Sequence, residues 1–340
     1  MLALTACVKE PAAPPKPVTD DRPLLTILGN NYSFSMFYSS LQRTGLDKML
    51  DSAGPFTLLA PDDDAFNRSG ITPDSLARIE TTTLRTLIGY HIIRSAVPYE
   101  AIPQAVGTKY PTVAGPVVYV SRPIPGNQQF QPLTLKIVHV NGVNVNRADI
   151  TASNGIIHVM NSVLYYPVST VKSWLENNAS YSFFTMGLRQ FGLFDQLDGK
   201  GPWTILAPSN DIFLQHGIDS AAISVMDTLT YKKFLFSSGV LEQQMFFATD
   251  IKDAPPSRDQ PAFLMPDILL LFDAYNFKYG AVPYNYLDIE NIPVGPYFGD
   301  PFIYGDETIK LSDPDHLAGN GVVHGVNGVA VLPENAIKQQ

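Results

Sequence analysis

Alternating apolar and polar positions predict a short strand at two places in the chain. Residues 56–66 read FTLLAPDDDAF, and residues 203–213 read WTILAPSNDIF. Each segment opens with β-favouring residues in the pattern of a half-buried strand. An Ala-Pro pair then ends the strand, because the residue before proline avoids helical backbone angles. Short polar residues of the kind that cap helices follow, so both segments predict the same strand-to-helix corner.

The two corners belong to a longer internal repeat. Phe56 and Trp203 lie 147 residues apart, and the Tyr-Ser-Phe segment at Tyr32 recurs 149 residues later. The segment NGIIHVMNSVLYYP, which starts at Asn154, recurs 166 residues later as NGVVHGVNGVAVLP. Similar segments in the same order indicate a duplicated domain. The larger last offset predicts a net insertion of 19 residues late in the second copy.

Within each copy, the periodicity predicts helices first and strands later. Helical spacing of apolar residues covers 32–50, 76–93, 181–197 and 227–241. Short strands are expected at 117–120, 135–140 and 156–166. Asn141-Gly142 between apolar runs is typical of a hairpin turn. Helices followed by strands predict an α+β fold.

Three markers in this order resemble the fasciclin-like domain family. They are the strand-to-helix corner, the pair Tyr90-His91, and a closing strand that begins Asn154-Gly155 and carries His158. The resemblance covers most of the chain as two copies. It implies two tandem fasciclin-like domains, each a wedge-shaped β-sandwich flanked by short helices. Members of this family are typically extracellular or surface-attached and mediate adhesion, and no catalytic residues come with the family.

The repeat and the composition predict the domain boundaries. Residues 1–23 are expected to be a lipoprotein signal remnant and a Pro-rich tether, followed by fasciclin-like domain 1 at 24–168. Domain 2 is expected at 172–333, with an aromatic-rich insertion at about 246–310. A length of 340 residues suits two domains. Because only residues 169–172 connect them, we expect the domains to touch or to be held at a restricted angle.

Cys7 is the only cysteine of the chain, so an intramolecular disulfide is excluded. The segment Leu4-Thr5-Ala6-Cys7 resembles the lipobox of bacterial lipoproteins, in which the cysteine carries lipid. The alternative is a chance match in an unstructured start. Six residues before Cys7 are too few for a complete signal peptide, so we expect this start to be truncated or misassigned. The Pro-rich residues after Cys7 predict an extended tether.

Charge and hydropathy exclude two classes of protein. The net charge of −9 argues against nucleic acid as a partner, because nucleic-acid-binding proteins carry clustered Lys and Arg. No run reaches the ~18 apolar residues that a membrane-spanning helix needs. We therefore expect contact with the membrane through the lipid anchor only, in an outer-membrane lipoprotein of the bacterial envelope that is exposed at the surface.

The pair Tyr90-His91 has two interpretations. It resembles the segment implicated in receptor binding in animal members of the family. The alternative is structural, because the pair ends an apolar run and both rings can pack with their polar atoms hydrogen-bonded. The second copy has Ser237-Ser238 at this position, so any activity of the pair would belong to the first domain.

Other polar residues favour structural roles. His158 and His324 occupy matching positions on the closing strands, which predicts a shared structural hydrogen bond rather than a metal site. The carboxylates of Asp62, Asp63 and Asp64 suggest either calcium or a helix cap, and the cap is favoured because the other EF-hand ligands are missing. The chain lacks the nucleophile-elbow, Walker and dinucleotide motifs. We expect no enzyme activity, no metal and no cofactor.

The aromatic-rich insertion is the remaining candidate for binding. Exposed tyrosines stack on sugars and anchor proteins, whereas packed tyrosines would only hold a long loop on its own domain. The tyrosines of this segment are Tyr275, Tyr279, Tyr284, Tyr286, Tyr297 and Tyr304. The sequence therefore predicts an adhesion protein that binds an extracellular protein or glycan. The alternative is an accessory glycan-binding lipoprotein of an outer-membrane nutrient-uptake complex, with a transporter as its partner.

Overall fold

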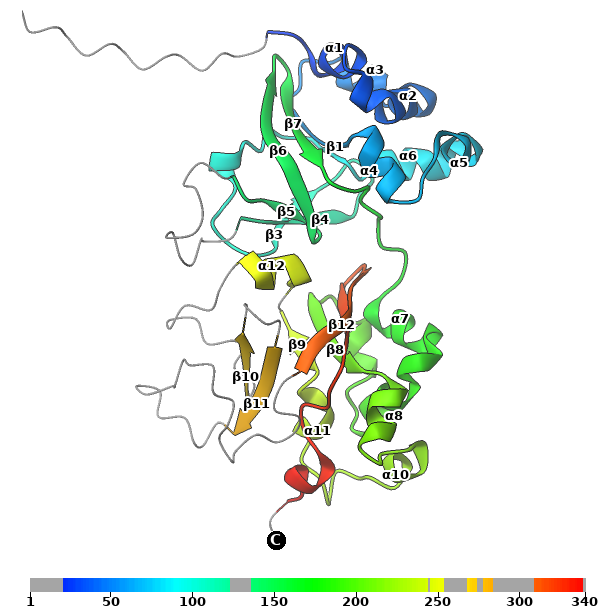
Figure 1. The fold of residues 1–340 in the computed structure, drawn as a ribbon, viewed down its shortest axis with the longest axis vertical. Helices are drawn as coiled ribbons and strands as arrows, with labels where there is room; N and C mark the ends of the chain where they lie inside the picture. The colour runs from blue at the N-terminus through cyan, green and yellow to red at the C-terminus, as the bar shows by residue number, and fades with distance from the viewer. Residues whose placement is uncertain are drawn as a thin grey trace, which may run out of the picture.

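The computed structural model describes residues 21–122, 136–243, 245–253, 268–273, 278–283 and 309–338. Cys7, the tether and most of the predicted insertion lie outside these residues. The described chain forms two units, the first drawn above the second in Figure 1. In each unit, short helices lie on one side of a sheet (Figure 1).

The helices of the first unit are shorter than the apolar spacing predicts. Gly45, at φ 70°, ends α2 in the left-handed conformation that favours glycine, so the segment 32–50 is divided. Ile79 has an extended backbone between α5 and α6, so the segment 76–93 is divided too. The helices are α1 (Leu24–Gly29), α2 (Ser35–Thr44), α3 (Asp47–Leu50), α4 (Asp63–Arg68), α5 (Pro73–Arg78) and α6 (Thr81–Gly89), with 3-10 turns at Tyr32–Phe34 and Tyr99–Ala101.

The sheet of the first unit has seven strands in the order β2-β1-β7-β6-β5-β4-β3. They are β1 (Phe56–Pro61), β2 (Ile92–Ile93), β3 (Thr108–Pro111), β4 (Val117–Ser121), β5 (His139–Val140), β6 (Val143–Ala152) and β7 (Gly155–Met160). All six residues of β1 are buried, so the prediction of a half-buried strand is wrong. The strand lies between β7, parallel to it, and β2, and apolar clusters cover both of its faces.

Two apolar clusters divide the first unit into a helical layer and a sandwich. Leu58 packs with the helices, whereas Leu59, one residue on, packs with Val118 of β4. Two register shifts between Val145 and Ile150 interrupt the pairing of β6 with β7. Bulges of this kind bend a strand, which allows β6 to join the two arms of a wedge. The hairpin turn predicted at Asn141-Gly142 is present, with both residues at positive φ.

The second unit repeats this arrangement. Its β8 (Trp203–Pro208) pairs in parallel with β13 (Gly321–Val326), and Trp203 faces Gly321 as Phe56 faces Gly155. The sheet order is β10-β11-β12-β13-β8-β9. The other elements are α7 (Val171–Asn177), α8 (Ser182–Gln190), α9 (Asn210–Gln215), α10 (Ser220–Ser224), α11 (Phe234–Ser237), α12 (Ala248–Asp253), β9 (Val240–Glu242), β10 (Ile268–Asp273), β11 (Lys278–Pro283) and β12 (Ile309–Ala318), with 3-10 turns at Ala179–Tyr181, Asp195–Asp198 and Pro333–Ala336.

Three expected elements differ from the structure. The segment 227–241 is not one helix, because the Asp227 carboxylate accepts the N–H groups of Leu229 and Thr230 and forms a turn. Only α11 and the start of β9 remain regular there. The strand predicted to run to residue 166 ends with β7 at Met160. Of the strand predicted at 135–140, the structure describes residues 136–140, and among these only β5 belongs to a ladder.

The two units touch along a seam, as the short connection predicts. Four buried residues form its apolar part: Tyr119, Met245, Phe247 and Val322. Beside them, His139 Nδ1 of the first unit lies 3.3 Å from Asp250 Oδ1 of the second, and both side chains are buried. Figure 1 shows α12 at this seam, between the two units.

Candidate functional site

Tyr90 is fully buried, and its hydroxyl group is hydrogen-bonded inside the fold. It donates to the Val117 carbonyl at 2.9 Å and accepts a hydrogen bond from Asn141 Nδ2 at 2.8 Å. Burial raises the pKa of this hydroxyl, which keeps it protonated. The side chain therefore connects the start of β4 with the turn between β5 and β6.

His91 is buried beside it and bridges two segments of the core. Its Nδ1 lies 2.9 Å from the Leu87 carbonyl, and its Nε2 accepts the Leu164 N–H at 2.9 Å. Burial lowers the pKa of His91 to about 4, so the ring is neutral at pH 7 and donates from Nδ1. Both members of the Tyr-His pair are core residues, and neither ring is exposed for direct contact with a partner.

His158 and His324 make the same hydrogen bonds in the two units, as the sequence predicts. His158 Nδ1 accepts the Asp149 N–H at 3.3 Å, and its Nε2 lies 2.8 Å from the Val97 carbonyl. His324 Nδ1 accepts the Asp315 N–H at 3.0 Å, and its Nε2 lies 3.1 Å from the Phe246 carbonyl.

Each of these histidines thus ties a strand bulge to the loop across the sandwich. In the part of the chain that the structure describes, no group of three His, Cys, Asp or Glu residues could hold a metal ion.

Two aspartates of the first corner, Asp62 and Asp63, bind the starts of helices, as predicted. Asp62 Oδ1 accepts the Ala65 N–H at 2.7 Å and begins α4. The Asp63 carboxylate accepts the Met36 N–H and the Ser35 hydroxyl at the start of α2. Asn210 takes the place of Asp63 in the second unit and accepts the Phe183 N–H at 2.9 Å.

Replacing Asp62 by alanine should lower the free energy of unfolding by about 1 kcal/mol, because α4 loses its cap. Urea titration followed by circular dichroism measures this loss, and Asp62→Asn, which keeps the acceptor, should recover most of it. Addition of calcium should not change the melting temperature of the parent protein. A clear increase with calcium would show that these carboxylates bind the ion.

The tyrosines of the insertion are not placed by the structure. Tyr275, Tyr284, Tyr286, Tyr297 and Tyr304 lie outside the described residues, as does Cys7. Of Tyr279 only the backbone is described, within β11, where it pairs with Phe272 and Ile309. None of the described helices is long and apolar enough to cross a membrane.

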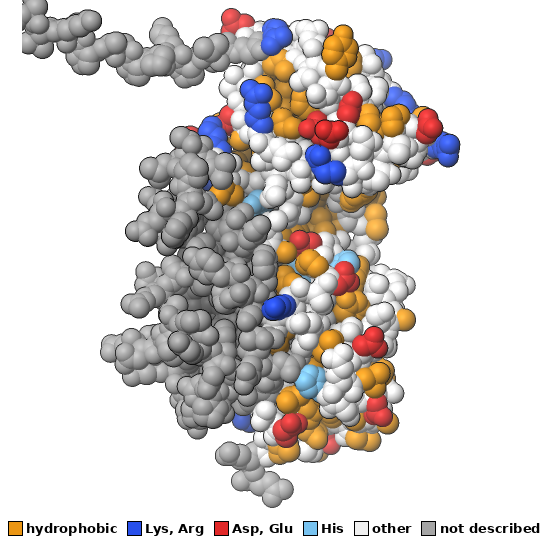
Figure 2. Space-filling model, in the orientation of Figure 1, with side chains coloured by type: hydrophobic (Ala, Val, Ile, Leu, Met, Phe, Trp, Pro, Cys, Tyr) orange, Lys and Arg blue, Asp and Glu red, His pale blue; other side chains and the backbone are white. Residues whose placement is uncertain are grey.

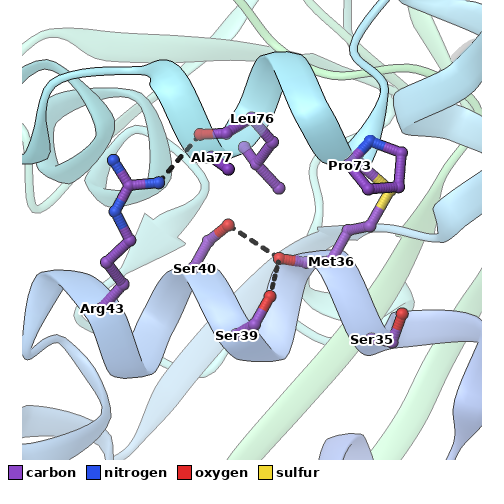
Figure 3. Close-up of a pocket in the computed structure, with 8 residues that line it drawn as sticks. All are labelled: Ser35, Met36, Ser39, Ser40, Arg43, Pro73, Leu76 and Ala77. Carbon is purple, nitrogen blue, oxygen red and sulfur yellow. Dashed lines mark hydrogen bonds between the residues drawn. The ribbon is translucent and has the colours of Figure 1, made fainter.

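A groove between α2 and α5 is an open surface that the sequence did not reveal. It has a volume of about 290 Å³. Its lining is formed by Ser35, Met36, Ser39, Ser40, Arg43, Pro73, Leu76 and Ala77 (Figure 3). Arg43 crosses one end of the groove and donates to the Leu76 carbonyl at 2.8 Å and to the Ile79 carbonyl. The guanidinium therefore closes that end and fixes the distance between the helices.

The same place in the second unit differs in its side chains. Met186 and Gly187 stand where the first unit has Ser39 and Ser40. Gln190 takes the place of Arg43 and donates to the Met226 carbonyl at 2.7 Å. A side chain of the helix thus bonds to a carbonyl of the neighbouring segment in both units, whereas Ser39, which is exposed, and Ser40, which is buried, belong to the first. The neighbouring Ser39 and Ser40 were the sequence signal of this groove.

A second hollow lies at the end of the second unit. It has a volume of about 450 Å³, and His216, Tyr231 and Glu334 contribute to its walls. Val225, on its rim, is 76% exposed. On the face drawn in Figure 2, Lys and Arg side chains are scattered among Asp and Glu and do not form one basic patch. This distribution is unlike a nucleic-acid-binding surface.

Comparison with known proteins agrees with the architecture. The sequence model of the fasciclin domain matches residues 32–167. Transforming growth factor-beta-induced protein ig-h3 from Sus scrofa is 29% identical over 184 residues, which are 53% of this chain and 25% of that protein. Human stabilin-1 is 24% identical over 299 residues, which are 85% of this chain and 10% of that protein. The chain thus spans a quarter or less of these two relatives.

A solved FAS1 domain pair from the insect cell adhesion molecule fasciclin I aligns with 90% of this chain and 99% of its own, at 18% identity and a TM-score of 0.37. The stabilin-1 alignment is longer than either unit, and the two units share their corner, closing strand and histidine contacts. Residues 32–167 therefore match the fasciclin domain, and a second unit that repeats the same elements follows them.

Proposed function

We propose that this chain is a non-enzymatic adhesion protein of the bacterial cell envelope that binds an extracellular protein. The match to the fasciclin domain carries this proposal, because domains of this family occur in adhesion proteins. The lipid anchor on Cys7 and the tether after it would hold the two domains away from the membrane. The outer surface of the pair is then available to a partner.

The placement of the polar residues supports binding rather than catalysis. Tyr90, His91, His158 and His324 are buried and hydrogen-bonded to the backbone of their own unit or to its side chains. A general acid or base must reach its substrate, so these four groups are poorly placed for that role. The groove between α2 and α5 instead offers exposed hydroxyl groups beside apolar surface, which suits a side chain of a partner protein.

The binding proposal is tested with the full chain carrying Cys7→Ala, on immobilised collagen, on fibronectin and on a glycan array. We expect saturable binding to a protein surface and none to the glycans. Ser39→Arg fills the groove and should weaken binding at least about tenfold if the groove is the contact. Ser224→Arg, on exposed α10 of the second unit, is the matched control. Binding to glycans alone would favour the uptake-complex alternative, and turnover of chromogenic glycosides or esters would contradict the proposal.

The anchor is tested separately. Full-length protein expressed behind a complete signal peptide should partition into detergent and gain the mass of acyl chains, because a lipidated cysteine anchors the protein. Cys7→Ala should remain in the aqueous phase. Identical behaviour of the two proteins would remove the lipid anchor from the proposal and leave the binding surface unaffected.

A further inference from the structure

The seam between the units is built on the hairpin turn of the first unit. Gly142 lies so close to Phe247 that a Cβ on this glycine would be 3.0 Å from the Phe247 Cβ. The Thr249 hydroxyl donates to the Gly142 carbonyl at 3.1 Å. The turn therefore receives Phe247 and the first residues of α12, and only a glycine leaves room for them.

Strand β4 and the start of α12 complete the contact. The rings of Tyr119 and Phe247 lie 6.5 Å apart, and Phe247 is fully buried. Asp250 accepts the Phe247 N–H at 2.9 Å through one oxygen, while its other oxygen lies 3.3 Å from His139 Nδ1. The Asp250 carboxylate therefore holds Phe247 in place within the second unit and also faces His139 of the first unit.

The buried Tyr90 hydroxyl fixes the position of this receiving surface. It binds the Val117 carbonyl at the start of β4 and the Asn141 side chain in the turn. Asn141, at φ 48°, also accepts the Tyr119 N–H at 2.8 Å through its side-chain oxygen. The Tyr90 hydroxyl and the Asn141 side-chain amide thus join β4 to the turn at Asn141-Gly142, the two parts of the first unit that contact Phe247.

The segment that contacts the first unit, from Phe247 to Asp250, has different residues at the matching positions of the first unit. Val97 and Phe246 are equivalent, because each carbonyl lies against Nε2 of the matching histidine. Counting on from them, Pro98 and Ala101 in the first unit stand where Phe247 and Asp250 stand in the second. The first unit therefore lacks the aromatic ring and the carboxylate that make the contact. The two units have different roles at the seam, because only the second supplies Phe247 and Asp250.

We propose that Tyr90 is a positioning residue for the interdomain seam, and that its hydroxyl keeps the turn at Asn141-Gly142 in the conformation that accepts Phe247. Tyr90 thus influences the surface of the protein through the relative placement of its two domains. This role does not depend on which ligand the protein binds.

Hydrogen exchange of the full chain measures the effect of Tyr90→Phe, which keeps the ring and removes the hydroxyl. The amides of Phe247 and Asp250 should exchange roughly tenfold faster, because the seam opens more often. The amides of β8 should not change. Tyr165→Phe is the matched control, since its hydroxyl binds the Ser69 carbonyl away from the seam, and it should leave all of these rates unchanged.

Two further variants separate positioning from simple loss of stability. Asn141→Gly tolerates the positive φ and removes the amide bridge, so it should accelerate the same two amides. In the background of Phe247→Ala, where the seam has lost its central ring, Tyr90→Phe should cause no further acceleration at Asp250. Unchanged exchange at Phe247 and Asp250 in both Tyr90→Phe and Asn141→Gly, or an undiminished effect in the Phe247→Ala background, would overturn the proposal.

Discussion

Asn154→Ala is expected to lower the free energy of unfolding of the first unit by about 4 kcal/mol. The Asn154 side chain accepts the Leu24 N–H at 2.9 Å and donates to the Leu50 and Ser52 carbonyls at 2.8 and 3.0 Å. Alanine would leave these backbone groups without partners in a mostly buried place, and each such group costs about 1–3 kcal/mol. Denaturant-dependent hydrogen exchange at the Leu58 amide measures the loss.

The duplication supplies a second copy of the same experiment. Asn320 accepts the Val171 N–H and donates to the Leu197 and Gly199 carbonyls. Asn320→Ala should therefore destabilise the second unit by a similar amount, which the fluorescence of its two tryptophans reports. Asn146→Ala, at an exposed position, is the control and should stay within about 0.5 kcal/mol. A loss below about 1 kcal/mol for both buried asparagines would contradict this prediction.

Acid should destabilise the first unit far more than the second. The folded pKa of His91 is about 4, against an ordinary value of 6.5. The stabilisation from its neutral ring is fully present above pH 6.5 and is lost as the pH falls through 4, because the unfolded chain binds the proton first. A difference of this size corresponds to about 3 kcal/mol. Burial lowers the pKa of His158 as well, which adds to the loss.

In the second unit, the pKa of one buried group is lowered and the pKa of another is raised, and their opposite effects on stability fall in the same pH range. Burial lowers the pKa of His324 to about 4, which costs stability in acid. Burial raises the pKa of Asp315 to about 6 from an ordinary 3.8, so its folded carboxylate is unfavourable above pH 6 and is relieved as the pH falls. The two contributions should largely cancel between pH 6.5 and 4.

Unfolding at pH 7 and pH 4.5 tests this asymmetry. Both tryptophans, Trp174 and Trp203, belong to the second unit, so their fluorescence follows that unit, and exchange at Leu58 follows the first. Asp315→Asn removes the compensating carboxylate and should make the second unit as acid-sensitive as the first. Equal losses in the two units of the parent protein would show that the opposite shifts do not cancel.

Much of the architecture could be predicted because it is local. The Ala-Pro pair ends β1, the Asp62 side chain caps α4 and the Asn141-Gly142 turn closes a hairpin, each through residues next to one another in the chain. The Asn-Gly pair that begins each closing strand, at Asn154-Gly155 and Asn320-Gly321, is also explained. A Cβ at Gly155 would lie 2.3 Å from the Phe56 carbonyl oxygen, so only glycine allows the closing strand to approach β1.

Predictions that needed distant contacts were incomplete or wrong. Helical spacing suggested a helix at 227–241, but the Asp227 carboxylate accepts the Thr230 N–H and forms a turn there, and Tyr231 pairs with the distant Ile337. The groove was not predicted either, because α2 and α5 come together only in the folded unit and Arg43 spans them. Periodicity reports which face of a segment is apolar, and it carries no information about what that face meets.

The sequence by itself determined that the chain contains two copies of one α+β unit, with the same corner, closing strand and histidine. These features follow from backbone preferences and from side chains that bond to nearby groups, so they can be recognised in each copy. Only the tertiary structure decided that Tyr90 and His91 are buried, that Phe247 enters the first domain, and that exposed serines line a groove. Burial and docking depend on residues far apart in the chain, and their free energy comes from surface removed from water after folding.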